Sequence, residues 1–163
     1  MEVNYLFSLF LLIHIISGIV CLVTGIFAMS AKKRKGTHTL AGEIYHGSYV
    51  FVFFTALIMS ILHWQESQYL FYIALFSYGF AIVGYAAVKK KWRNWMGSHI
   101  GGMLGSYIGI VTATLVVNIP RIPVLNEFPV LLFWFLPSII GTPFIILVGR
   151  KRRSRKKLCQ PRI

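Results

Sequence analysis

The sequence predicts an all-α polytopic membrane protein: a bundle of five transmembrane helices with the N-terminus outside and the C-terminus in the cytoplasm. Three observations predict this fold class: an apolar composition, five long uncharged runs, and basic residues gathered after alternate runs. Hydrophobic residues make up 56% of the 163 residues and charged residues 13%, whereas a soluble domain carries about 25% charged residues. This balance excludes a disordered chain, a coiled coil and an ordinary water-soluble enzyme.

Each uncharged run is long enough to cross a bilayer once and too short to cross it twice. The runs occupy residues 3–31, 44–65, 67–88, 94–120 and 128–149. A hydrocarbon core of about 30 Å needs roughly 20 residues of helix. Helices are favoured over barrel strands because the runs are apolar on all sides. We therefore expect one integral membrane domain over residues 1–163, with spans at about 4–30, 42–64, 68–88, 95–118 and 129–149.

The basic residues predict the orientation. Sixteen of the 17 Lys and Arg residues follow the first, third and fifth runs, and Arg121 is the exception. By the positive-inside rule, the side of the membrane that carries these 16 basic residues is cytoplasmic. Residues 150–163 then form a basic cytoplasmic tail, which we expect to attract anionic lipid. Nucleic acid is not an expected partner, because no aromatic platform accompanies the charge.

Two runs carry small residues at helical spacing, which lets a second helix approach closely. In the first run Gly18 and Gly25 lie on one face with His14, Cys21 and Ala28, in steps of three and four. In the fourth run the glycines recur at every fourth position, at Gly97, Gly101, Gly105 and Gly109. We expect both faces to pack against helices. The fourth-run face can serve a neighbour in the same chain, a second copy in a homo-oligomer, or a membrane partner.

The histidines are the one compositional feature that suggests a functional site, because ionisable groups inside a membrane are costly. His46 and His99 lie at matching depths, each about six residues from the cytoplasmic end of its span. Glu43 lies three residues before His46 and shares its helical face. His38 lies at the interface below them, and His14 lies nearer mid-membrane. We expect a candidate ligand or proton-relay site near the cytoplasmic side, with Glu43 as third ligand or proton acceptor and His14 as an accessory.

Four interpretations of these histidines stay open. His46 and His99 can be axial ligands of a b-type haem in an electron-transfer protein. The same two side chains, with Glu43, can bind a transition metal such as iron or zinc. The histidines can hydrogen-bond across helices and fix packing, which is the interpretation we favour, or they can line a proton or solute path.

Enzyme motifs are absent from the sequence. It contains no P-loop, no HExxH, no GxSxG and no glycine-rich dinucleotide turn. We assign no catalytic residues, and the motifs favour a protein that is not an enzyme.

The chain resembles a family of small bacterial multi-pass membrane proteins, domain of unknown function 2306. The residues that carry the resemblance are His14, Gly18, Gly25, Lys35, Gly36, His38, Gly42, Tyr45, Trp95, Met96, His99, Met103, Ser106, Tyr107, Pro137 and Gly141. The resemblance implies an integral protein of the bacterial plasma membrane with no assigned activity or catalytic residues. It also supports treating His38, His46 and His99 as one region.

Overall fold

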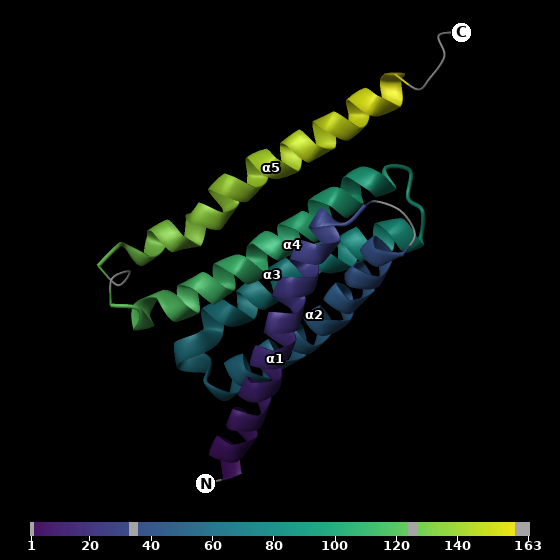
Figure 1. Ribbon diagram of the computed structural model, residues 1–163. Helices are drawn as coiled ribbons and strands as arrows, with labels where there is room; N and C mark the ends of the chain where they lie inside the picture. Colours follow the sequence, from purple (N-terminus) through teal and green to yellow (C-terminus); the bar gives the residue numbers. More distant parts are fainter. Residues whose placement is uncertain (1, 33–35, 124–126, 159–163) are drawn as a thin grey trace. The chain divides into compact units, whose positions relative to one another are not determined.

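The computed structural model describes residues 2–32, 36–123 and 127–158, without the side chains of residues 2–4, 120 and 152–158. The described residues form five long α-helices and one short 3-10 helix, with no strand among them (Figure 1). The helices are α1 Glu2–Ser30, α2 Thr37–Leu62, α3 Trp64–Lys89, α4 Trp95–Asn118 and α5 Val130–Leu158, and η1 is Ile119–Arg121. The predicted all-α fold with five membrane-spanning helices is confirmed.

Every helix is long and apolar enough to cross a membrane. The candidate spans are Tyr5–Ser30, Thr37–Leu62, Trp64–Lys89, Trp95–Asn118 and Val130–Lys151. They differ from the predicted spans mainly at their ends. α2 begins at Thr37, directly after Gly36, whose φ of 125° is a conformation that L side chains rarely adopt. α5 continues through basic residues of the tail to Leu158. Cations near a helix C-terminus interact favourably with the helix dipole and so stabilise this extension.

Large apolar side chains stay exposed along the helices, as expected of surfaces that face lipid acyl chains. In α5, for example, Leu131, Ile139, Ile140 and Leu147 are all more than 60% exposed. The buried positions carry many small or polar residues, among them Ser17, Ser60, Ser77, Ala81 and Ser106. Small side chains inside and large apolar ones outside are typical of packed transmembrane helices.

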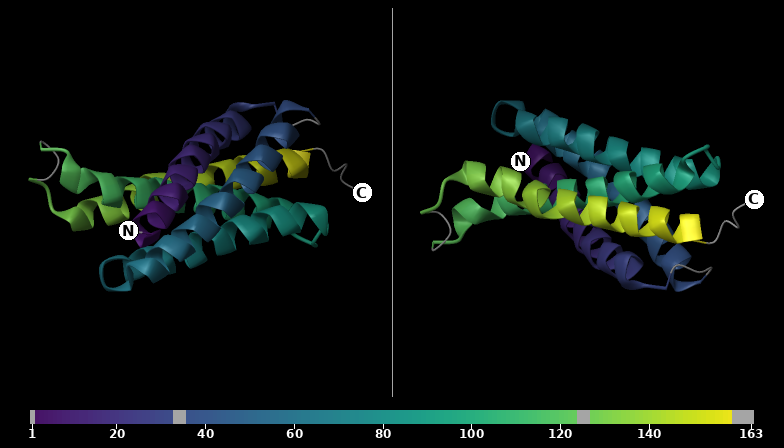
Figure 2. Two further views of the ribbon diagram at one scale, coloured as in Figure 1. Left: turned by 90° about the horizontal axis from the view of Figure 1, so that it is seen from below. Right: turned by 90° about the horizontal axis from the view of Figure 1, so that it is seen from above.

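The chain forms two compact units, and the boundary between them falls inside α3. Unit 1 is Met1–Gly79 and contains α1, α2 and the first part of α3. Unit 2 is Phe80–Ile163 and contains the rest of α3 with α4, η1 and α5. Within unit 1, α1 packs along α2, and within unit 2, α4 packs along α5 (Figure 2).

Candidate functional site

One face of α1 contacts α2 at intervals of seven residues. The residues on this face are Phe7, His14, Cys21 and Ala28. Their partners, in the same order, are His63, which caps the C-terminus of α2, and Thr55, Tyr45 and His38 of α2. Seven residues are close to two helical turns, so all four contacts fall on one seam, as in heptad packing. We call this set of four contacts the α1–α2 ladder.

The His14 contact has a defined hydrogen-bond direction. The Thr55 hydroxyl lies 2.6 Å from the Phe51 carbonyl oxygen, to which it donates its proton. That hydroxyl oxygen lies 2.9 Å from His14 Nδ1 and must therefore accept, so the His14 Nδ1–H is the donor. Thr55 is buried and His14 is half-buried. The contact joins α1 to α2 and ends on a backbone carbonyl.

The next two contacts also end on backbone carbonyls. The Cys21 thiol, fully buried, donates to the Tyr45 carbonyl oxygen at 3.7 Å. His38 Nδ1–H donates to the Ala28 carbonyl oxygen at 2.8 Å, which satisfies an acceptor in the last turn of α1. The fourth contact, between the rings of Phe7 and His63, is edge-to-face with centroids 4.5 Å apart.

The ladder is built for packing. Carbonyl oxygens accept a hydrogen bond but cannot pass a proton on, and contacts seven residues apart are separated by about 10 Å of helix. Hydrogen bonds between transmembrane helices contribute about 0.6 kcal/mol on average and at most about 2 kcal/mol. The contacts of His14 and His38 therefore support the packing interpretation for these two histidines, and they disfavour a proton path along this seam.

His46 belongs to a different part of unit 1, an aromatic cluster between α2 and α3. Its members are His46, Tyr49 and Phe53 of α2, which share one face, and Tyr78 of α3. The Tyr78 ring stacks nearly parallel to all three, with centroid distances of 6.0, 5.8 and 4.4 Å respectively. Tyr49 is only 2% exposed. The cluster presents flat π surfaces beside an imidazole inside the membrane-spanning region.

Glu43 lies on α2 three residues before His46 and is half-buried. No group of three or more His, Cys, Asp or Glu side chains that could hold a metal ion occurs in the part of the chain that the structure describes. The grouping of Glu43 with His46 and His99 as metal ligands stays a prediction.

His99, in unit 2, lies on α4 and reaches the backbone of α3. Its Nδ1 lies 3.1 Å from the Gly84 carbonyl oxygen. Because a carbonyl only accepts, Nδ1 carries the proton, and in the neutral ring Nε2 carries the lone pair. Metal-bound histidines have this arrangement, in which one ring nitrogen donates to an acceptor and the other is the ligand atom.

The backbones of α3 and α4 touch beside His99. A Cβ added to Gly102 would lie 2.5 Å from the Gly84 nitrogen and 2.7 Å from the Phe80 carbonyl oxygen. A Cβ added to Gly84 would in turn lie 2.7 Å from the Met103 nitrogen. No other residue than glycine fits at either position, so Gly84 and Gly102 set the distance between these helices.

The predicted glycine face makes fewer close contacts. A Cβ at Gly101 or Gly18 would meet nothing within 4 Å, and the atoms nearest to one at Gly97 belong to the neighbouring Asn94 side chain, from 2.8 Å. A Cβ at Gly105 would lie 3.3 Å from the Phe80 ring. Gly25 is buried and Gly109 is half-buried. Sequence reasoning missed Gly102, because it lies one residue outside the four-residue repeat.

Comparison with known proteins identifies the family. No curated protein and no solved structure matches the chain. Residues 11–146 match a family described as "Predicted membrane protein (DUF2306)". The match covers most of the chain and confirms the resemblance drawn from its histidines, glycines and aromatic residues. The chain therefore belongs to the DUF2306 family of predicted membrane proteins.

Proposed function

We propose that this membrane protein crosses the bacterial plasma membrane five times, with its basic turns and tail in the cytoplasm. The support is the positive-inside rule applied to the 17 Lys and Arg residues. Cys159 offers a direct test, because Cys21, the other cysteine, is buried. A membrane-impermeant maleimide should label the chain only after cells are opened, and Cys159→Ser should abolish that labelling. Labelling in intact cells would contradict the orientation.

We propose further that the protein has a histidine-based site that binds b-type haem for electron transfer. The observation that carries the proposal is the His99 hydrogen bond to the Gly84 carbonyl. It holds the imidazole in the tautomer whose Nε2 is the ligand atom, inside a membrane-spanning helix. Haem needs only two axial ligands from the protein, so it does not require a cluster of three side chains.

His46 is the second candidate ligand. Unlike His14 and His38, it is not part of the α1–α2 ladder, and its ring lies among the aromatic rings of Tyr49 and Tyr78. Aromatic and apolar surroundings exclude water and favour binding of the flat, apolar haem ring. His46 and His99 are each supported by contacts within their own unit, and each is tested by its own substitution.

The test is the absorption spectrum of the detergent-purified protein, oxidised and then reduced with dithionite, with haem and metal content measured on the same sample. We expect a Soret band that sharpens on reduction. His99→Ala and His46→Ala should each lose the band, whereas His63→Ala, in the contact with Phe7, should keep it. Loss of haem from a variant at full protein yield would support the substituted histidine as a ligand. A colourless wild-type protein purified from haem-supplemented cells would contradict the proposal.

A membrane partner is the second proposal for the glycines of α4. Its specific support is Gly101, where an added Cβ meets nothing within 4 Å. Crosslinking in membranes should capture a second copy or another membrane protein, and Gly101→Leu should remove the crosslink. An unchanged crosslinking pattern in Gly101→Leu would exclude this face as the contact.

A further inference from the structure

The turn between α3 and α4 has the backbone conformation of a helix cap. The Trp92 N–H donates to the Ala87 carbonyl oxygen at 3.3 Å, and the Lys91 N–H donates to the Val88 carbonyl oxygen at 3.4 Å. Lys91 itself has a φ of 49°. These are the two hydrogen bonds and the left-handed residue of a Schellman motif, which ends a helix in one conformation. The motif therefore defines the backbone conformation from which the side chains of this turn project.

Lys91 occupies the position in this motif where glycine is strongly preferred. A lysine there is held in a conformation that L side chains adopt at a cost, which draws attention to its charge. Backbone geometry alone would be served better by glycine. Lys91 therefore adds a cation to the turn at a backbone position that glycine would occupy at lower cost.

The turn exposes four basic side chains and two tryptophans. The residues are Lys89, Lys90, Lys91, Trp92, Arg93 and Trp95, and all are exposed. The Lys89 ammonium nitrogen lies 5.1 Å from the centre of the Tyr85 ring, so this side chain folds back along α3. Trp92 and Trp95 are 40% and 38% exposed. Tryptophan of this kind is typical of the level at which lipid headgroups lie.

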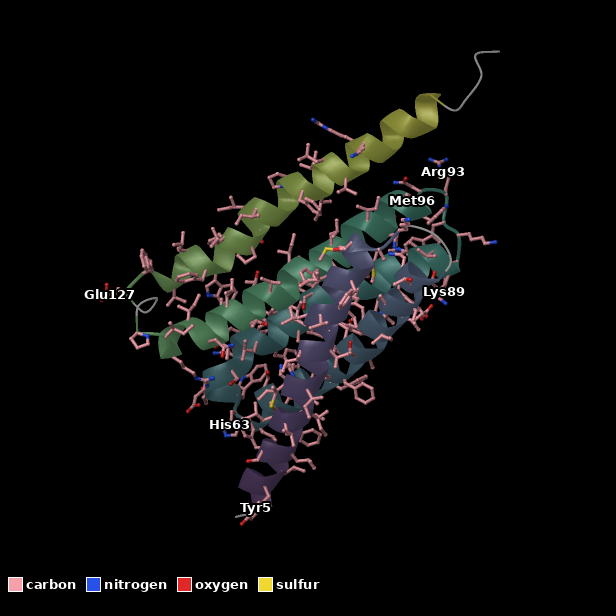
Figure 3. All side chains as sticks on the ribbon, viewed as in Figure 1. Tyr5, His63, Lys89, Arg93, Met96 and Glu127 are labelled. Carbon is pink, nitrogen blue, oxygen red and sulfur yellow. The ribbon has the colours of Figure 1, made fainter. Side chains whose placement is uncertain are left out.

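No acidic residue of unit 2 lies near these cations. Glu127 is the only Asp or Glu among residues 80–163, a segment that holds 13 of the 17 Lys and Arg residues. It lies beyond the far end of α4, which at 24 residues is about 36 Å long. Figure 3 shows Lys89 and Arg93 at one end of the α4–α5 pair and Glu127 at the other. Unit 2 therefore has no Asp or Glu side chain beside the turn to balance its charge.

We propose that the α3–α4 turn binds the phosphate headgroup of an anionic phospholipid, with Lys90, Lys91 and Arg93 as its charged contacts. Charge complementarity and the interfacial tryptophans favour a lipid over a soluble anion. Clusters of basic residues next to a membrane span attract anionic lipid, and each cation adds to the affinity. The site uses residues other than those of the basic tail and does not depend on the haem proposal.

The probe is phosphatidylglycerol, titrated onto the full-length protein in neutral detergent and counted by native mass spectrometry. The test variant is Lys90→Gln/Arg93→Gln. The control is Lys32→Gln/Arg121→Gln, which removes the same charge elsewhere on the chain. We expect the test variant to bind the first phosphatidylglycerol more weakly by on the order of tenfold, and the control to resemble wild type. Phosphatidylcholine should bind all three proteins equally.

Lys91→Gly is the second variant, because it removes the charge while suiting the left-handed conformation. We expect it to fold at least as well as wild type and to lower phosphatidylglycerol affinity by about fivefold. Equal losses in the test and control variants would show a diffuse charge effect and overturn the site. Unchanged affinity in both Lys90→Gln/Arg93→Gln and Lys91→Gly would overturn it as well.

Discussion

The two units hold their helices together in different ways. In unit 1, α1 and α2 meet through side chains, in a ladder of polar and aromatic contacts at seven-residue intervals. In unit 2, α3 and α4 meet through their backbones at Gly84 and Gly102. Both are known solutions for helices in lipid, where the hydrophobic effect does not drive helices together. We therefore expect unit 2 to tolerate added side-chain volume poorly, and unit 1 to lose little stability when one contact is removed.

The largest effect should follow from adding one methyl group at the backbone contact of unit 2. Gly102→Ala places a Cβ against backbone atoms of Gly84 and Phe80, which cannot rotate away, so the two helices must separate. Overpacking of this kind costs typically 1–3 kcal/mol. Thermal unfolding in detergent should show a clear fall in the melting temperature.

Gly101→Ala is the matched control, since its Cβ meets nothing within 4 Å. Alanine is favoured over glycine in a helix by roughly 1 kcal/mol, so this variant should be as stable as wild type or slightly more stable. Equal melting temperatures for Gly101→Ala and Gly102→Ala would contradict the close backbone contact at Gly102.

A smaller loss should follow from removing one polar contact of the α1–α2 ladder. Thr55→Val keeps the shape of the side chain but removes the acceptor for His14. We expect a loss of about 1 kcal/mol, within the range for hydrogen bonds between transmembrane helices. In a double-mutant cycle, His14→Ala should cost less in the Thr55→Val background than in wild type.

Thr24→Val is the control for this contact. The Thr24 hydroxyl donates only to carbonyl oxygens of its own helix, at Val20 and Cys21. Its removal should change the melting temperature less than Thr55→Val does. Additive effects of His14→Ala and Thr55→Val would show that the two side chains do not interact.

The smallest effect should occur where an added methyl group meets a flexible side chain. A Cβ at Gly141 of α5 would overlap the end of the Ile108 side chain of α4, which can change rotamer. We expect Gly141→Ala to cost less than about 1 kcal/mol, well below Gly102→Ala. A loss equal to that of Gly102→Ala would show that α5 packs as tightly as the backbone contact and would sharpen the account of unit 2.

Most of the fold could be predicted from the sequence, because charged residues bound the spans and a run that is apolar on all sides satisfies its backbone in a bilayer by forming a helix. The helix ends were harder. The predicted gap between the second and third spans, around residues 65–67, is helical in the structure, and the turn is reduced to His63 between Leu62 and Trp64. Polar residues such as Glu66 can lie in the first turn of a helix, so a break in hydropathy does not mark a break in the helix.

The candidate site could be predicted only in part. The α1 face through His14, Cys21 and Ala28 follows from helical spacing within one segment. Its partners depend on the register between two antiparallel helices, which local spacing does not determine. The stacking of Tyr78 on His46 likewise joins two helices. For these reasons the sequence can nominate a face but not the residues that meet it.

We propose that the histidines divide into packing residues in the α1–α2 ladder and a haem ligand, His99, at the α3–α4 contact. The most direct measurement is the Soret absorbance per mole of purified protein in His99→Ala and His14→Ala, prepared side by side with wild type. We expect His99→Ala to lose the band and His14→Ala to keep it with a lower melting temperature. A haem-loaded His99→Ala protein, or loss of the band in His14→Ala alone, would contradict it.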